Sequence, residues 1–442
     1  MITITAVGGY GEVGRNCTLL QVDGVGIILD MGLHLDHYIE YTNDEDLTFL
    51  DPAELTKVGA VPDIKQIDKR NVRAIIPTHA HLDHIGAIPF LERQFNAPII
   101  CTPYTGAVIR AICKNEKIPL RNKIRVLNIN AHLRLTEDIH VEFINVTHST
   151  PQTVAVAIHT KYGAVVYAND FKLDNHPVIG KKPNYERLQQ LGKEGVLALM
   201  IDSLYAAEEK KCPSETVAKD MLNDVLLGIQ NTGKVIIVTT FSSHIARLKS
   251  IIELGRQLNR RVVLLGRSLA KYVFAAQDVQ LVNFSSQAKL VPYSKQVKRI
   301  LQDIERKGKE KYMIVCTGHQ GEPKAVLAKM VDGVYPFKLG YEDSVIFSCA
   351  VIPSPINIKN RRILEEKLKA KGVRIFKDIH VSGHAAREDH HEMINMLRPR
   401  HIIPAHCTPE MAKAMASLAR EMGYDHKNIH MIVNQDTISL KA

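Results

Sequence analysis

Residues 78–86 read THAHLDHIG and contain three histidines and one aspartate. The run NVRAIIPT, which ends at Thr78, has the composition of a buried strand, and the run IGAIPFLERQF, which starts just after His84, has that of a helix. We therefore expect the motif on a strand-to-helix loop, where side chains converge without obeying strand alternation. The first two histidines can share one metal ion, while the aspartate and the last histidine turn toward a second. The motif predicts half of a two-metal centre, with the candidate ligands His79, His81, Asp83 and His84.

The missing ligands of such a centre should follow other strands, because strand ends gather at one edge of a sheet. Three residues of ligand type do so: His148 follows VEFINVT, Asp170 follows AVVYAN, and His406 follows HIIPA. Two ions about 3.5–4 Å apart can share a hydroxide and clamp both oxygens in a phosphoryl displacement. In that arrangement Asp170 can bridge the ions, and Asp83 can both bind a metal and orient the nucleophile. The pattern therefore predicts a complete hydrolytic centre.

The rhythm of strands and helices divides the chain into two domains. Up to about residue 205, short β-rich runs separated by turns predict a mixed α/β lobe with antiparallel strands. From 206 onward, helices alternate with strands, which predicts a parallel, doubly wound sheet, and Ser214 is the expected N-cap of its first helix. After about residue 355 the pattern of helices and strands resembles that of the first lobe again. We therefore expect a first domain formed by 1–205 and 356–442 and a second domain, 206–355, inserted into it.

The composition favours a cytoplasmic globular protein. Hydrophobic residues make up 45% and charged residues 24% of the 442 residues. Seven scattered cysteines without a CxxC pair do not form a disulfide framework, which favours a reducing compartment. We find no signal-peptide pattern, and the longest apolar runs have the length of strands, so we expect no membrane association. The formal net charge of +10 favours a polyanionic partner such as nucleic acid.

The strand ends of the inserted part carry three turns rich in hydroxyl groups and glycines. In a doubly wound sheet, ligands bind outside the carboxyl ends of the strands, and helix N-termini hold phosphate groups. Caps and tight turns explain any one of these turns, but three in one domain favour phosphate binding. The turns are Phe241-Ser242-Ser243-His244, Gly266-Arg267-Ser268 and Thr317-Gly318-His319-Gln320-Gly321.

Short motifs form an ordered set along nearly the whole chain. Those of the first lobe are Gly8-Gly9 with GEVGRN, LDMG at 29–32, THAHLDHIGAIP at 78–89, THSTP at 147–151, NDFKLD at 169–174 and Asp202-Ser203. Those that follow are TTFSSHIAR at 239–247, LLGRS at 264–268, CTGHQGEP at 316–323, VIFSCAVIP at 345–353, HVSGHA at 380–385 and IPAH at 403–406. In content and order they resemble the ribonuclease J family, metallo-β-lactamase-fold nucleases of the β-CASP group.

The resemblance implies an α/β fold in which a doubly wound α/β β-CASP domain interrupts a metallo-β-lactamase αββα sandwich. It also implies two Zn²⁺ per chain, with Mn²⁺ able to serve related enzymes. One ion resembles a site of His79, His81, His148 and Asp170. The other resembles a site of Asp83, His84, Asp170 and His406.

The same resemblance assigns three β-CASP positions, Asp202, His384 and His406. Of these, His384 is the candidate for protonating the leaving oxygen and steadying the scissile phosphate, alongside Asp83 and Asp202 as catalytic residues. A histidine titrates near neutral pH, and the glycine-lined turn around His384 exposes backbone N–H groups to an anion. The candidate substrate-binding residues are Ser243, His244, Arg267, Ser268, Ser382, Gly383 and Ala385.

The activity implied by the resemblance is 5′→3′ exonucleolytic trimming of single-stranded RNA, with a preference for a 5′-monophosphate end. Because the chain stops at Ala442 without the extra C-terminal domain of bacterial relatives, it resembles the shorter archaeal type, and a homodimer is compatible with that type. Two positions depart from the family pattern: Asn169 and Cys407 stand where glycine is usual. Both residues are small enough to be accommodated.

Three other functions fit parts of the sequence. A β-CASP endonuclease on RNA or DNA would share the metal centre but ignore the 5′ end. A small-molecule metallohydrolase is disfavoured by the inserted domain and the basic charge, because a small substrate needs no long cradle. A metal-free RNA-binding protein with an idle site is disfavoured by the complete set of ligands.

Overall fold

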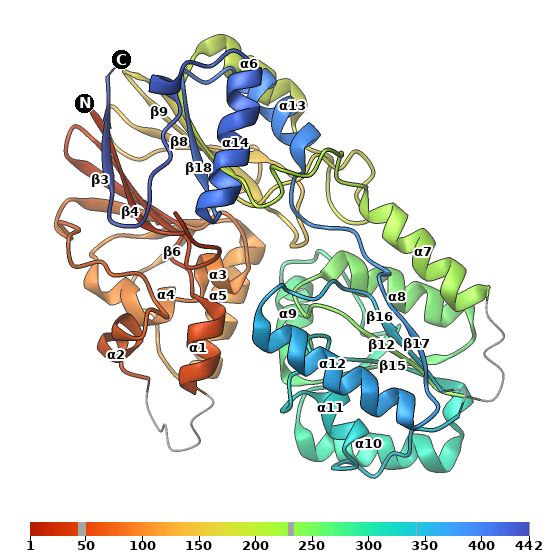
Figure 1. Ribbon diagram of the computed structural model, residues 1–442. Helices are drawn as coiled ribbons and strands as arrows, with labels where there is room; N and C mark the ends of the chain where they lie inside the picture. Colours follow the sequence, from red (N-terminus) through yellow and green to blue (C-terminus); the bar gives the residue numbers. More distant parts are fainter. Residues whose placement is uncertain (43–49, 229–233, 342, 442) are drawn as a thin grey trace. The chain divides into compact units, whose positions relative to one another are not determined.

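The computed structural model describes residues 1–42, 50–228, 234–341 and 343–441, and the chain forms two compact units (Figure 1). The first unit consists of Met1–Asn175, Lys181–Cys212 and Gly383–Ala442. The second consists of His176–Gly180 and Pro213–Ser382, and is therefore inserted into the first. The domain boundaries that we expect at residues 205 and 355 stay predictions.

The first unit contains two sheets. The first has the order β19-β1-β2-β3-β4-β5-β6, antiparallel from β19 to β3 and parallel from β3 to β6. Its strands are β1 (Ile2–Gly8), β2 (Cys17–Val22), β3 (Val25–Leu29), β4 (Val72–Ile76), β5 (Ile99–Cys101), β6 (Ile124–Val126) and β19 (Thr437–Leu440). The second sheet has the order β18-β11-β10-β9-β8-β7. Its strands are β7 (His132–Arg134), β8 (His140–Asn145), β9 (Val154–Thr160), β10 (Gly163–Ala168), β11 (Val196–Asp202) and β18 (His401–Ala405).

The two sheets pack face to face around a common apolar core. Ile4, Ile27 and Ile76 of the first sheet share this core with Val156 and Ile403 of the second. Alternating strand residues supply it, because successive side chains of a strand point to opposite faces. Burying this apolar surface is the main force that holds the sandwich together.

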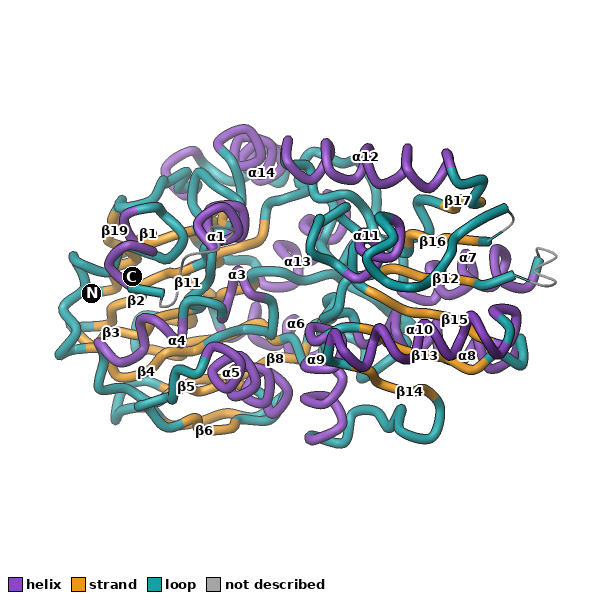
Figure 2. Tube along the Cα trace, turned by 90° about the horizontal axis from the view of Figure 1, so that it is seen from below, coloured by secondary structure: helices purple, strands orange, loops and turns teal. Residues whose placement is uncertain are grey.

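Helices cover the outer face of each sheet, which gives the αββα layering (Figures 1 and 2). Over the second sheet, Leu188, Met393 and Met415 of three helices pack with Ile201 and Ile402. These helices are α6 (Tyr185–Glu194), α13 (Arg387–Leu397) and α14 (Pro409–Glu421). The helices along the first sheet are α1 (Leu35–Thr42), α2 (Pro52–Lys57), α3 (Leu82–Ile85), α4 (Ile88–Leu91) and α5 (Pro103–Glu116).

The THAHLDHIG motif differs in one respect from the loop expected from the sequence. The helix was expected after His84, but α3 already includes Asp83 and His84, with His81 as its N-cap. The backbone N–H groups of His84 and Ile85 donate to the carbonyl oxygen of His81, which closes this single turn. The turn aims residues 81, 83 and 84 in different directions, as the separation into two metal groups requires.

The second unit is a parallel sheet with the order β14-β13-β15-β12-β16-β17. Its strands are β12 (Ile236–Thr239), β13 (Arg261–Leu265), β14 (Ala288–Val291), β15 (Tyr312–Cys316), β16 (Ser344–Phe347) and β17 (Arg374–Phe376). Its helices are α7 (Glu215–Leu227), α8 (Ile245–Gln257), α9 (Arg267–Asp278), α10 (Ser294–Lys307), α11 (Val326–Val331) and α12 (Pro355–Ala370). The expected N-cap is confirmed: the hydroxyl of Ser214 accepts a hydrogen bond from the N–H of Thr216.

The fold class expected from the sequence, an α/β sandwich interrupted by a doubly wound α/β part, is therefore confirmed. Within the described ranges, every helix is too short or too polar to cross a lipid bilayer.

Candidate metal centre

All seven candidate metal ligands belong to the first unit and lie directly after strands or in α3. His79 follows β4, His148 follows β8, Asp170 follows β10 and His406 follows β18. His81, Asp83 and His84 come from the start of α3. The two sheets thus bring together residues separated by more than 300 positions in the chain. This clustering at the strand ends was expected from the sequence.

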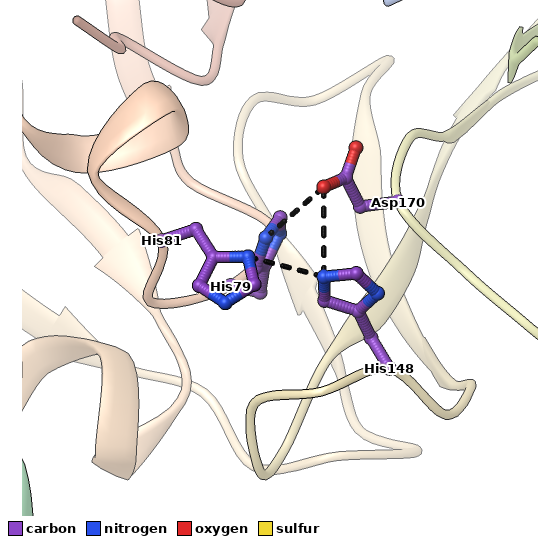
Figure 3. A group of neighbouring side chains, drawn as sticks. All are labelled: His79, His81, His148 and Asp170. Carbon is purple, nitrogen blue, oxygen red and sulfur yellow. Dashed lines mark hydrogen bonds and ion pairs between the residues drawn. The ribbon is translucent and has the colours of Figure 1, made fainter. Parts of the chain in front are cut away.

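The first ligand group is His79, His81, His148 and Asp170, whose ligand atoms all lie within 4.8 Å of one another (Figure 3). His148 Nε2 lies 3.1 Å from His81 Nδ1 and 3.6 Å from Asp170 Oδ2. His79 Nε2 lies 3.5 Å from the same carboxylate oxygen. Four donors at these separations surround a space the size of one cation, since zinc binds nitrogen and oxygen at about 2.0–2.2 Å.

The second group is Asp83, His84 and His406, and Asp170 lies between the two groups. His84 Nε2 is 3.5 Å from Asp83 Oδ2 and 3.2 Å from Asp170 Oδ2. His406 Nδ1 is 3.9 Å from Asp83 Oδ2 and 3.9 Å from Asp170 Oδ1. The Asp170 carboxylate therefore contacts members of both groups, as a bridging ligand must.

The donor set fits divalent cations by its hydrogen bonding and its charge. His79 Nε2 and Asp170 Oδ1 are buried and have no hydrogen-bond partner among the residues that the structure describes, a costly state for polar atoms that a bound metal ion would relieve. Burial lowers the pKa of His79 and His148, and lowers that of His81 to about 4, so these rings are neutral donors. This donor set therefore fits divalent metal ions.

The charge of His84 is set by three carboxylates. Burial by itself lowers the pKa of His84, but Asp170, Asp30 and Asp83 raise it well above its usual value. The positive charge of His84 in turn stabilises the ionised carboxylates, and it helps to hold the pKa of Asp83 and Asp170 low despite their burial. A metal ion would displace the proton of His84, because histidine binds metals in its neutral form.

Groups outside the donor set hold the histidine rings in place. Asp30 accepts a hydrogen bond from His84 Nδ1 at 2.7 Å, and the N–H and hydroxyl of Thr78 donate to the same carboxylate. His148 Nδ1 donates to the carbonyl oxygen of Gly383 at 2.6 Å. Each bond fixes the tautomer that leaves Nε2 free to bind a metal. The sequence analysis did not identify Asp30, although a lone aspartate after a buried strand was a usable signal.

Asn16 contacts two members of the second group. It was not among the predicted site residues. Its amide nitrogen lies 3.0 Å from His84 Nε2 and 2.8 Å from His406 Nδ1. Asn169, the departure from the family's glycine, donates to Asn16 Oδ1 at 3.0 Å. Asn169 therefore orients a buried amide beside the centre, a contact that glycine could not make.

The backbone at the centre adopts conformations that most residues avoid. Asp30, Asp170 and His406 have φ between 53° and 59°, in the left-handed region, which costs about 1–2 kcal/mol for a residue with a side chain. Gly32 is required for another reason: an added Cβ would lie 1.6 Å from the carbonyl oxygen of Asp83. Such strain persists at sites where the surrounding contacts over-determine the geometry.

His384 lies beside the donor set and pairs with Asp202. Its Nδ1 is 2.9 Å from Asp202 Oδ2, and its Nε2 is 3.9 Å from Asp170 Oδ2. Burial by itself lowers the pKa of His384, but Asp170 and Asp202 together raise it to about 9. Its ring stacks on His406, with centroids 5.6 Å apart and an interplanar angle of 12°. The structure thus brings together the three predicted β-CASP positions.

The predicted substrate-binding residues are dispersed over both units. Ser243 and His244 follow β12, and Arg267 and Ser268 begin α9 after β13, a strand separated from β12 by β15. His244 is buried, accepts a hydrogen bond from the N–H of Arg247 and lies 3.3 Å from Glu215. Ser382 ends the second unit, while Gly383 and Ala385 begin the last part of the first.

Gly383 and Ala385 are constrained by the first unit itself. A Cβ on Gly383 would lie 2.9 Å from His148 Cε1, so only glycine lets the backbone approach this ligand. The N–H of Ala385 donates to the carbonyl oxygen of Phe171 at 2.5 Å. Both contacts hold the turn that carries His384 against the ligand loops.

Asp30→Asn should weaken metal binding without removing a ligand. The carboxylate fixes the His84 tautomer, and loss of such a partner typically costs 10- to 100-fold in metal affinity, so we expect about that loss at the second group. Competition with a chromogenic chelator measures it. Asp63→Asn, a half-buried aspartate outside the centre, is the control and should leave affinity unchanged. Equal affinities of Asp30→Asn and wild type would contradict the role of Asp30.

The sandwich, the shared carboxylate and the inserted parallel sheet define a class of protein, the metallo-β-lactamase-fold hydrolases with a β-CASP domain. Residues 10–190 match the family model "Metallo-beta-lactamase superfamily" and residues 233–365 match "Ribonuclease J, beta-CASP domain". Residues 372–432 match "Zn-dependent metallo-hydrolase RNA specificity domain".

The chain belongs to the ribonuclease J family. It is 44% identical over 445 residues to ribonuclease J of Methanocaldococcus jannaschii, a match that covers 100% of this chain and 99% of the relative. It is 42% identical over 430 residues to ribonuclease J of Pyrococcus abyssi, covering 96% and 94%. Ribonuclease J 1 of Streptococcus pyogenes is 31% identical over 449 residues, covering 100% of this chain and 75% of the relative.

A crystal structure of a protein of unknown function from Enterococcus faecalis has a similar fold. The TM-score is 0.64 at 17% sequence identity, and the match covers 99% of both chains. At that identity the likeness supports the fold alone.

Proposed function

We propose that this protein is a metal-dependent ribonuclease that removes nucleotides from the 5′ end of single-stranded RNA and prefers a 5′-monophosphate. The observation that carries the proposal is the Asp170 carboxylate, around which two His/Asp donor groups meet. Membership of the ribonuclease J family and the RNA specificity domain match at 372–432 support RNA as the substrate. The net charge of +10 suits a polyanion.

The cofactors we propose are two Zn²⁺ ions per chain, with Mn²⁺ as the alternative, because histidine and aspartate donors suit both metals. Their ligands would be the two groups described above, with Asp170 shared between them. When bound, the ions supply Lewis-acid polarisation of the phosphate and lower the pKa of water. Asp83 is the least buried carboxylate of the set, with 18% of its side chain exposed, so it is suited to orient the attacking water.

His384 is the proposed acid for the leaving oxygen. Asp202 Oδ2 lies 2.9 Å from Nδ1 of His384 and stabilises the protonated form of the ring. Nε2 therefore faces the donor set, where a departing oxygen would accept its proton. Gly383 and Ala385 hold the turn that carries His384 against the ligand loops.

Binding of the 5′-phosphate is assigned to the second unit's strand ends. Arg267 and Ser268 begin α9 with exposed side chains, where the helix N-terminus and a guanidinium favour an anion. Ser243 and Ser382 add hydroxyl donors in this proposal. His244 is held by Glu215 and caps α8, so we expect it to support Ser243 rather than bind phosphate with its ring. A homodimer and a cytoplasmic location stay predictions from the sequence.

Digestion of one RNA with three different 5′ ends tests the proposal. Purified protein with Zn²⁺ or Mn²⁺ should release mononucleotides first from the 5′-labelled monophosphate RNA, more slowly from the triphosphate and hydroxyl forms. His81→Ala, which removes one ligand of the first group, should release none. Internal fragments from all three RNAs would establish the endonuclease instead. Intact RNA in the presence of bound metal would refute both nucleases.

A further inference from the structure

A basic groove lies on the first unit between α5 and β6, and we name it the α5–β6 groove. Arg110, Lys114 and Lys117 line one side and come from α5 or its C-cap. The floor is formed by Ile118, Leu120 and Ile124, all partly exposed. The groove has a volume of about 560 Å³, within the range of ligand-binding pockets. Figure 2 shows α5 lying against β5 and β6.

The charge in this region is far more concentrated than in the chain as a whole. Residues 110–125 hold six basic side chains and one acidic side chain, a net of +5, against +10 for all 442 residues. The side chains of Arg110, Lys114 and Lys117 make no hydrogen bond or ion pair within the described ranges, and all three are exposed. Basic side chains on ordinary surfaces are usually interspersed with acids, so an unpaired cluster favours an anionic partner.

Hydrogen bonds hold the wall of the groove opposite α5 in place. The buried carboxylate of Glu92 accepts hydrogen bonds from the N–H groups of Arg121 and Asn122 at 2.8 and 3.0 Å. Arg93 donates to the carbonyl oxygen of Pro119 at 2.8 Å. These bonds fix the segment between α5 and β6, so the groove keeps its shape without a ligand. A preformed site costs less ordering free energy on binding.

The groove lies well away from the metal centre. α5 begins after β5, at the same sheet edge where His79 follows the parallel neighbour β4. Its 14 residues carry the chain toward the opposite edge, about 20 Å along the helix axis. Lys114 and Lys117 lie at that far end. A ligand that spans both places must be long, and a mononucleotide in the metal centre cannot reach the groove.

We propose that the α5–β6 groove is an accessory binding site for the sugar-phosphate backbone of an RNA strand whose end occupies the metal centre. This inference rests on the proposed function. The three cations contact successive phosphates, and the apolar floor accepts the faces of sugars or bases. No aromatic ring lines the groove, so base stacking contributes little there and the site has little sequence preference. Its contribution is electrostatic and therefore depends on salt.

Equilibrium binding tests the inference, with the His81→Ala background preventing cleavage. The triple variant Arg110→Glu/Lys114→Glu/Lys117→Glu should bind an RNA of about 30 nucleotides at least about 30-fold more weakly at moderate salt. The slope of log K against log salt should fall by about 2, since each neutralised phosphate of a single strand contributes about 0.7. The loss should be much smaller for an RNA of about 4 nucleotides, which is too short to span both sites.

The control variant reverses three charges elsewhere on the same unit: Lys413→Glu/Arg420→Glu/Lys427→Glu. It has the same net charge, so it should bind the long RNA nearly as the unsubstituted background does. Equal losses in both variants, or unchanged binding and slope in the first, would overturn the inference. A milder variant, Lys114→Gln/Lys117→Gln, removes two of the three cations and should show about two thirds of the slope change. If the background itself binds no RNA, the proposed function fails instead.

Discussion

Asp170→Asn should lower the rate of RNA cleavage by about 1,000-fold or more, equivalent to about 4 kcal/mol in the barrier. The carboxylate lies between both ligand sets, with Oδ2 3.2 Å from His84 Nε2 and 3.5 Å from His79 Nε2. Replacing it by an amide removes one negative charge and one bridging oxygen from both sets. Single-turnover kinetics at saturating metal measures the rate, and elemental analysis should show a fall in bound metal.

Asp174→Asn is the matched control for this substitution. Asp174 is a buried aspartate of the same NDFKLD segment and lies 3.5 Å from Lys172, but it is outside both ligand groups. Its replacement should change stability and leave the metal content at the wild-type value. An Asp170→Asn protein with full metal content and normal rate would refute the bridging role.

Arg247→Leu should destabilise the second unit by about 3–5 kcal/mol, because it leaves a buried carboxylate without its partner. Arg247 is completely buried and binds Glu215 through two nitrogens, at 2.5 and 2.9 Å. It also donates to the carbonyl oxygens of Ser348 and Ile379. These hydrogen bonds connect α8 to the segments that follow β16 and β17. Thermal unfolding should show a fall of about 10 °C in the transition of this unit.

The acid limb of unfolding provides a second readout. Burial by itself raises the pKa of Glu215, but His244 and Arg247 lower it far below its ordinary value of 4.5. The pair therefore stabilises the fold above about pH 4.5, and this contribution is lost as pH falls toward the folded-state pKa. The difference in the free energy of unfolding between wild type and Arg247→Leu should therefore become smaller as the pH falls through this range.

Lys219→Ala is the control on the same two helices. Lys219 pairs with Glu253 at 2.9 Å, but 37% and 33% of these side chains are exposed, so the substitution should cost less than about 1 kcal/mol. Arg247→Leu/Glu215→Leu should recover part of the stability lost in the single variant, because no buried charge is left unpaired. Equal effects of Arg247→Leu and Lys219→Ala would contradict the importance of burial.

Much of the centre could be predicted from the sequence because its ligands follow recognisable strands. His148, Asp170 and His406 each follow an apolar run, and strands that run in the same direction end at the same edge of a sheet. The alternation of strands and helices after residue 206 likewise predicts a parallel sheet, which the structure has. Local composition and periodicity carry this information, and no long-range contact is needed to read it.

The supporting residues could not be predicted in the same way. Asp30 and Asn16 contact the centre only because β3 and the turn before β2 lie beside α3, and the position of Asp30 after a buried strand does not by itself show which residue it contacts. His244 has the sequence context of a phosphate-binding turn, but its ring contacts Glu215, a residue from another helix. Such roles depend on partners far away in the chain.

Residue type and short-range spacing were enough to predict the class of fold and to name the candidate metal ligands. The folded structure was needed to give the distances from Asp170 to the members of both groups, the pairing of Asp202 with His384, and the groove that Arg110, Lys114 and Lys117 line. A side chain's charge and hydrogen bonding depend on which groups surround it after folding. Burial and neighbouring charges shift pKa values, and the groups that surround a cation decide whether it is paired. Both depend on packing rather than on the order of residues.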